Sequence, residues 1–167
     1  MIRVYVLDYD EDDPSKCTGK KMVRMGLAGM TNRSMGIVLN PFSKITLSIE
    51  DRPIAEKYGI TVIDASWNFF EPSKIPKAKT SRRLPLLVAG NPINYAIAYK
   101  LSSVEAVFAS LYILGFVDQA MKLLGVNKWM RTFYELNKEL LEAYREKTRE
   151  DVEKIESEVL EKYREGP

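Results

Sequence analysis

The stretch Thr61-Val-Ile-Asp-Ala-Ser-Trp67 decides the fold class, because an apolar β-branched strand runs directly into an acid, a hydroxyl and an indole. Upstream of it, Ser48 or Asp51 is positioned to cap a short helix through Tyr58 that Gly59 ends. Another short helix is predicted at 20–27. Four more short apolar runs are predicted as strands, at 2–7, 36–39, 44–48 and 84–89. This alternation of strands and helices predicts an α/β sheet domain.

The second half of the chain has a helical pattern. Ser102 and Glu105 match a capping box, and the helix expected at 103–124 is apolar nearly all round, so it should be buried. A second helix is expected from Met130 to about Arg164, with a highly charged end. We therefore expect an N-terminal α/β domain at 1–84 and a mainly helical C-terminal domain at 85–167.

Composition excludes several kinds of chemistry. The 167 residues include no histidine, which rules out histidine bases, catalytic triads and imidazole metal sites. A single cysteine, Cys17, can form neither an intrachain disulfide nor a cysteine metal cluster, so no metal is expected. The N-terminus lacks the pattern of a signal peptide, and the longest apolar run, 106–117, is too short to span a bilayer. These features predict a cytoplasmic protein without a membrane partner.

Charge is unevenly distributed along the chain. The formal net charge is only +2, but residues 14–49 and 72–104 contain no acid and hold six basic residues each. Such stretches create a positive local potential that suits phosphate groups. A solvated face that happens to lack acids is the equally simple alternative.

Two short motifs allow more than one interpretation. Cys17-Thr-Gly-Lys-Lys21 is similar to part of a phosphate-binding loop, but position 14 is proline where that loop needs glycine, so a surface turn is the simpler interpretation. Asp64 is suited to act as a base or to hold an ammonium group, and Trp67 to stack on a ring or a sulfonium. Alternatively, Asp64 and Ser66 only cap the following turn while Trp67 lies in the core.

Six motifs, taken in order, resemble the small-subunit rRNA aminocarboxypropyltransferases. The resemblance extends from the first strand to about Tyr144. The motifs are Asp13-Pro with Lys16-Cys-Thr-Gly-Lys-Lys21, Leu39-Asn-Pro41, Asp64-Ala-Ser-Trp67, Leu84-Pro with Val88-Ala-Gly-Asn-Pro-Ile-Asn-Tyr95, Tyr99-Lys-Leu-Ser-Ser-Val-Glu-Ala106, and Trp129 with Glu135-Leu-Asn137. Thr18 and Ala65 stand where the family more often has Ser and Cys, and Phe70 where a smaller residue is usual.

The resemblance implies a reaction and a cofactor. These enzymes transfer the 3-amino-3-carboxypropyl (acp) group of S-adenosylmethionine (SAM) to N3 of a uridine or pseudouridine in small-subunit rRNA, and they release methylthioadenosine. The implied fold is a SPOUT-like knotted sheet domain with a helical C-terminal part that completes the SAM site. No metal is implied. The implied partner is small-subunit rRNA or a pre-ribosomal particle, with the oligomeric state left open.

Matching motif by motif assigns site residues. Thr18 would meet the carboxypropyl end of SAM, Ser103 its amino-acid moiety and Ile63 its ribose. Leu84 and Tyr99 would meet adenine through backbone atoms. Asp64 is the candidate catalytic base, or a ligand of the SAM amino group. The remaining predicted SAM-binding residues are Leu39, Pro41, Ser66 and Trp67. The predicted RNA-binding residues are Lys16, Lys20, Lys21, Arg24, Arg33, Lys79, Arg82, Arg83 and Lys100.

Two other functions compete with this one. A SPOUT-type RNA methyltransferase would share the fold, cofactor and partner, and would release adenosylhomocysteine instead. A non-catalytic assembly factor would bind rRNA whether or not SAM is present.

Overall fold

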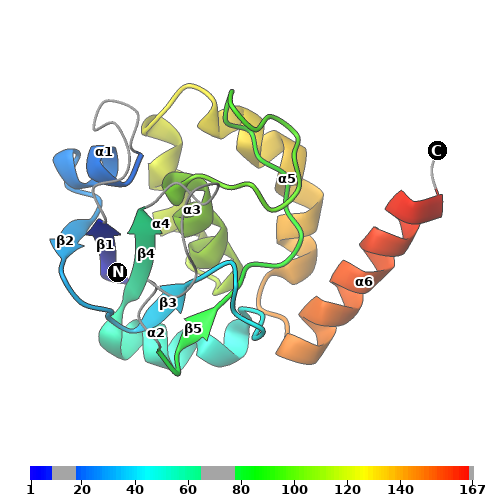
Figure 1. The fold of residues 1–167 in the computed structure, drawn as a ribbon, viewed down its shortest axis with the longest axis horizontal. Helices are drawn as coiled ribbons and strands as arrows, with labels where there is room; N and C mark the ends of the chain where they lie inside the picture. The colour runs from blue at the N-terminus through cyan, green and yellow to red at the C-terminus, as the bar shows by residue number, and fades with distance from the viewer. Residues whose placement is uncertain (9–17, 65–77, 166–167) are drawn as a thin grey trace.

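The core of the fold is a five-stranded, all-parallel sheet with the strand order β2-β1-β4-β3-β5 (Figure 1). The computed structural model describes residues 1–8, 18–64 and 78–165. The strands are β1 (Val4–Asp8), β2 (Gly29–Thr31), β3 (Ile37–Leu39), β4 (Ile60–Asp64) and β5 (Ser81–Arg82). This arrangement confirms the expected α/β class.

Strand register brings the ends of the strands to one edge of the sheet. Strands β1 and β4 pair along their full length, from Val4 with Ile60 to Asp8 with Asp64, and Leu39 of β3 lies opposite both Val62 and Arg82. Strands β1, β4, β3 and β5 therefore end together, and we call this side the carboxyl edge. Ligands of open parallel sheets bind outside such an edge.

The helices surround the sheet and form most of the second half (Figure 1). Helix α3 packs on β4, α1 and α5, and its buried residues run from Val104 to Ile113. The burial predicted for this segment and the Ser102–Glu105 capping box are both confirmed. The helices are α1 (Thr18–Arg24), α2 (Arg52–Tyr58) after a 3-10 turn η1 (Ile49–Asp51), α3 (Ser103–Ile113), α4 (Val117–Met121) with the 3-10 turn η3 (Lys122–Gly125), α5 (Met130–Tyr144) and α6 (Arg149–Glu165).

One apolar core joins the two halves of the chain. Val6 and Val62 of the sheet belong to the same buried cluster as Phe108 of α3 and Phe133 of α5. The rings of Phe108 and Phe133 meet edge to face at 5.9 Å. The division into domains at 1–84 and 85–167 stays a prediction.

Two helices expected to be continuous are broken. The segment 103–124 breaks at Gly115, whose φ of +92° lies in the left-handed region that favours glycine. The segment 130–164 breaks after Tyr144, where Glu146 has a φ of +54° and its N–H donates to the carbonyl of Ile113. Both predictions of an unbroken helix were wrong, because apolar periodicity continues through these turns.

Two predicted strands are absent and two short ones were missed. Segment 44–48 makes only one bridge, from Thr46 to Arg83, and segment 84–89 only one, from Val88 to Ala98. Strands β2 and β5 are too short, at three and two residues, to show an alternating pattern. The helical turn expected after Trp67 lies outside the described residues.

Among the described residues, no helix is long and apolar enough to cross a membrane. In the same part of the chain, no group of three or more acidic or Cys side chains is arranged to hold a metal ion.

Gly90 provides a direct test of how closely the chain approaches α5. A Cβ at this position would lie 2.6 Å from the backbone N and Cα of Phe133, whereas one at Gly125 would meet nothing within 4 Å. We expect Gly90→Ala to lower the free energy of unfolding by about 1–3 kcal/mol through overpacking. Gly125→Ala should be neutral or slightly stabilising. Urea unfolding of both variants measures the difference, and equal midpoints would contradict the close approach.

Candidate functional site

The segment from Arg83 to Ser102, which we call the edge loop, follows β5 at the carboxyl edge and ends at the N-cap of α3. It contains no named helix or strand. Its backbone forms a narrow turn of its own, in which the Ala89 N–H donates to Ile97 and the Tyr99 N–H donates to Leu87. Ala96 and Tyr99 have positive φ angles of 61° and 64°, which side-chain-bearing residues rarely adopt. The edge loop therefore needs support from outside itself.

Helix α3 supplies a first support through Glu105. Its carboxylate is fully buried and accepts from the Gly90 N–H at 2.7 Å, the Asn91 side-chain amide at 2.8 Å and the Ser102 N–H at 2.8 Å. Three donors on one buried carboxylate compensate its loss of hydration. Glu105 therefore joins the middle of the edge loop and its carboxyl-terminal end to the start of α3.

Helix α5 supplies a second support through an amide that replaces a missing strand. Asn137 accepts from the Val88 N–H and donates to the Val88 carbonyl, both at 2.8 Å, as a neighbouring strand would. Two residues before Val88, the Leu86 carbonyl accepts from the Tyr144 hydroxyl of the same helix at 3.0 Å. Burial first, and then the nearby Glu156 carboxylate, raise the pKa of Tyr144. The hydroxyl therefore stays protonated and remains a donor.

Helix α6 supplies a third support through Glu156, whose side chain is only 6% exposed. Its two oxygens accept from the Arg83 guanidinium at 2.7 and 3.1 Å, and Oε2 also accepts from the Leu86 N–H and the Tyr99 hydroxyl, each at 2.7 Å. Burial opposes ionisation of Glu156, but the donors and the positive charge of Arg83 outweigh it, so its pKa is lowered. Glu156 is thus a buried carboxylate ion paired with Arg83.

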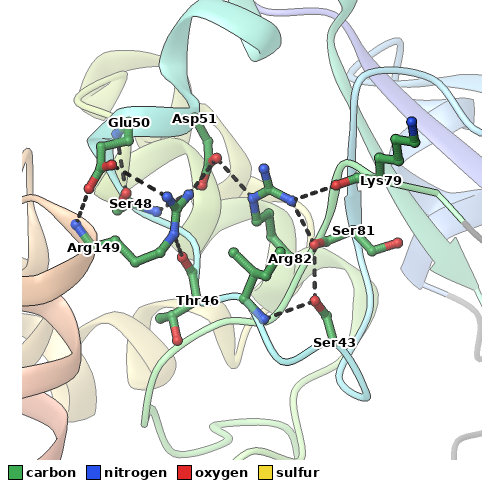
Figure 2. A network of polar contacts seen from close by, with 10 residues as sticks. Ser43, Thr46, Ser48, Glu50, Asp51, Lys79, Ser81, Arg82 and Arg149 are labelled. Atoms are coloured by element: carbon green, nitrogen blue, oxygen red, sulfur yellow. Dashed lines mark hydrogen bonds and ion pairs between the residues drawn. The ribbon is translucent and has the colours of Figure 1, made fainter.

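A second polar network fixes the start of α6 (Figure 2). Asp51, 2% exposed, accepts from Arg82 at 2.9 Å, from Arg149 at 2.7 Å and from the Ser48 N–H at 3.1 Å. Arg149 also donates to the Thr46 carbonyl at 2.9 Å. The network therefore ties β5, the start of α2 and the start of α6 to one buried carboxylate.

The structure places two predicted SAM-binding residues together. Thr18 is the first residue of α1, Ser103 is the first residue of α3, and the Val104 N–H donates to Thr18 Oγ1 at 3.2 Å. The starts of α1 and α3, which are far apart in sequence, thus meet at the place predicted for the amino-acid end of SAM.

The other predicted SAM-binding residues distribute along the carboxyl edge and the edge loop. Leu39 and Ile63 are buried near the ends of adjacent strands β3 and β4, and Pro41 is exposed just beyond β3. Leu84 and Tyr99 lie on the edge loop. Asp64 ends β4, but its side chain is not among those described. Ser66 and Trp67 lie outside the described residues. No described contact joins all of these residues, so the set stays a prediction.

The predicted RNA-binding residues fall into groups. Arg82 and Arg83 form ion pairs with Asp51 and Glu156, with side chains 11% and 26% exposed. Lys21 donates to Asn127 at 2.7 Å, Lys20 is half-buried and Lys16 lies outside the described residues. The remaining four are exposed: Arg24, Arg33, Lys79 and Lys100.

Sequence reasoning missed the parts played by Glu105, Asn137 and Glu156. Glu105 was assigned only to capping, and Asn137 only to a motif. One signal for Glu156 was present, because it lies four residues after Val152, a member of the apolar stripe of the last helix. An acid on an apolar stripe indicates a buried partner.

Comparisons with known proteins place this fold and these motifs in context. A family model described as "Ribosome biogenesis protein, C-terminal" matches residues 37–160. A second, described as "Possible Fer4-like domain in RNase L inhibitor, RLI", matches residues 2–34. Iron–sulfur clusters are held by several Cys thiolates, whereas this chain has one cysteine, so the second match marks only a likeness of sequence.

Three similar curated proteins each bear the name "16S rRNA aminocarboxypropyltransferase". The protein of Saccharolobus solfataricus is 53% identical over 96% of this chain and 98% of its own length. The Sulfurisphaera tokodaii protein is 54% identical over 96% and 97%, and the Thermoplasma volcanium protein 43% identical over 93% and 97%. A solved structure, the "SAM-dependent rRNA:acp-transferase Tsr3 from Vulcanisaeta distributa", matches with a TM-score of 0.80 and 36% identity, covering 93% of this chain and 96% of that one.

Asp51 offers a test of the network in Figure 2. We expect Asp51→Asn to lower the free energy of unfolding by about 2–4 kcal/mol, because Arg82 and Arg149 would lose their shared buried anion. Glu56→Gln is the matched control, since Glu56 is 54% exposed in its pair with Arg52 and should cost less than about 0.5 kcal/mol. Chemical unfolding at neutral pH measures both, and similar losses for the two variants would show that the network does not stabilise the fold.

Proposed function

The chain belongs to the family of 16S rRNA aminocarboxypropyltransferases, and we propose that it transfers the acp group of SAM to a small-subunit rRNA nucleotide. The single observation that carries this function is likeness along nearly the whole chain, in sequence to the named transferases and in fold to the SAM-dependent rRNA acp-transferase. A methyltransferase or a non-catalytic assembly factor is not favoured, because the relatives carry the transferase name.

SAM is bound at the carboxyl edge, between the edge loop and the start of α3. Thr18 and Ser103 hold its amino-acid end, and their proximity through the Val104 N–H supports this. The Tyr99 N–H already donates to the Leu87 carbonyl, so adenine contacts the Tyr99 carbonyl instead. The ribose lies at Ile63. A parallel sheet followed by a supported loop is compatible with a SPOUT-like trefoil knot, which belongs to the same proposal.

The chemistry needs positioning more than it needs a reactive side chain. SAM supplies a sulfonium with three electrophilic carbons, and the one presented to the nucleophile decides the product. Attack of the uridine or pseudouridine N3 on the propyl γ-carbon forms a C–N bond and breaks the C–S bond. Sulfur keeps the bonding electron pair, methylthioadenosine leaves, and N3 loses its proton. Neither histidine nor metal is required for this step.

Asp64 has two possible parts in this reaction. As a base it would take the N3 proton, and as a ligand it would hold the SAM amino group. The Asp64→Asn variant distinguishes them. Unchanged SAM affinity with lost turnover identifies a base, and lost SAM affinity identifies a ligand.

Exposed positive side chains are proposed to bind rRNA phosphates. Arg33 follows β2, whose end is paired with Leu7 near the end of β1, and Arg24 ends α1. Both are exposed. Arg82 and Arg83 already share their charge with acids of the fold, so their part in RNA binding is the smaller one.

Replacing Arg24 and Arg33 together by Gln tests this surface. We expect the plot of the logarithm of the 16S rRNA association constant against the logarithm of the salt concentration to become less steep, by about 1–2 in slope. The reason is that each phosphate contact that is lost lowers the number of counterions released on binding by about one. SAM affinity should be unchanged. Lys162→Gln, on the exposed end of α6, is the matched control and should leave the slope as it is. An unchanged slope in the double variant would exclude these two residues from the interface.

The transferase reaction is tested by incubating the protein with small-subunit rRNA or pre-ribosomal particles and SAM labelled in its carboxypropyl carbons. We expect label in the RNA and release of methylthioadenosine. A parallel reaction with methyl-labelled SAM is the control and should leave the RNA unlabelled. Methyl label in the RNA with adenosylhomocysteine as by-product would identify a methyltransferase instead. Tight RNA binding with no label from either substrate would identify an assembly factor.

A further inference from the structure

Helix α6 has a mostly exposed surface and a narrow inner face. Val152 is fully buried on this face and Glu156 is 5% exposed, whereas Tyr163 near the end of the helix is 65% exposed. In Figure 1 the helix lies beside α5 with its carboxyl-terminal end directed away from the sheet. A buried carboxylate here needs partners, and all of those observed lie on the edge loop.

The partners of Glu156 come from both limbs of the edge loop. Arg83 and the Leu86 N–H are on the limb that leaves β5, and Tyr99 is on the limb that approaches α3. Leu84, between Arg83 and Leu86, and Tyr99 are the two residues proposed to meet adenine. One carboxylate therefore connects the two backbone positions on which adenine recognition depends.

We infer that Glu156 is a positioning residue for SAM binding, which orders the two limbs of the edge loop so that Leu84 and Tyr99 present their backbone groups together. This inference rests on the proposed function. Glu156 itself is not a catalytic residue, since its oxygens are occupied by loop donors. The charged terminal helix thereby becomes part of the cofactor site.

Other contacts keep the fold together when Glu156 is changed. The start of α6 is held separately by Asp51 and Arg149 at 2.7 Å. The middle of the edge loop is held by Asn137 at Val88 and by Glu105 at Gly90. Loss of the Glu156 charge should therefore loosen the two limbs without unfolding the protein. A loop that is correctly arranged only part of the time lowers the apparent affinity for its ligand in proportion.

The experiment compares Glu156→Gln with Glu158→Gln, a matched change at an exposed position of the same helix. We expect the Kd and KM for SAM to rise about tenfold in Glu156→Gln. The kcat at saturating SAM and the KM for rRNA should stay within about twofold, because binding and not chemistry is affected. Amide hydrogen exchange without SAM should be faster at Leu86. Glu158→Gln should match the wild-type protein in every measurement.

Tyr99→Phe is the second variant, and it keeps the test valid if Glu156→Gln folds poorly. It removes only the hydroxyl that donates to Glu156, and a rise in the Kd for SAM of about two- to fivefold is expected.

Three outcomes would overturn the inference. The first is unchanged SAM affinity in a folded Glu156→Gln protein. The second is a fall in kcat with unchanged KM for SAM, because such a fall indicates only a loss of folded enzyme. A wild-type protein that binds no SAM would overturn the proposed function and this inference with it. The wild-type measurement therefore separates the two failures.

Discussion

The structure depends on one constraint, which is that the edge loop has buried backbone groups and no adjacent strand to pair with them. Side chains of three helices take that place: Glu105 from α3, Asn137 from α5 and Glu156 from α6. Unpaired buried amides would each cost about 1–3 kcal/mol. The packing of the helical half is therefore inseparable from the shape of the loop, and the loop retains a conformation with positive φ at Ala96 and Tyr99.

Ion pairs determine where the last helix lies. Arg82 and Arg83 are consecutive, yet Arg82 pairs with Asp51, which precedes it in the sequence, and Arg83 with Glu156 in the last helix. Breaking a buried pair costs more than forming it gains, so such pairs specify one arrangement against others more than they add stability. They also explain why an acid-free stretch of sequence need not be a phosphate-binding surface. Its charges can be neutralised by acids that are distant along the chain.

The sequence predicts the elements in which apolar residues recur at a regular spacing, and it misses the parts of the fold that depend on single contacts. β1, β4 and the buried helix α3 were predicted because their apolar patterns are dense, and Ser102 with Glu105 because capping is local. The turns at Gly115 and Glu146 were missed because nothing in the apolar spacing marks a positive φ. The segment 84–89 resembled a strand, since its apolar side chains are buried, but its partners are an amide and a carboxylate that no local pattern reveals. For the candidate site, the motifs predicted Thr18 and Ser103, which lie at the starts of two helices that the fold brings together. They gave no indication of Glu156, whose partners are 57–73 residues away.

A transferase without histidine must act mainly through geometry. Selection of the propyl carbon of SAM over its methyl carbon requires a small change in presentation, and a misplacement of about 1 Å can cost about a hundredfold in rate. A loop without regular structure would ordinarily move too much for this. In this fold, its two limbs are fastened to each other through Glu156 and its middle to α3 and α5, so the loop acquires the rigidity of the helices that hold it. The charged terminal helix, which shows no motif in the sequence, is by the same inference one of the elements that order the loop proposed to bind SAM.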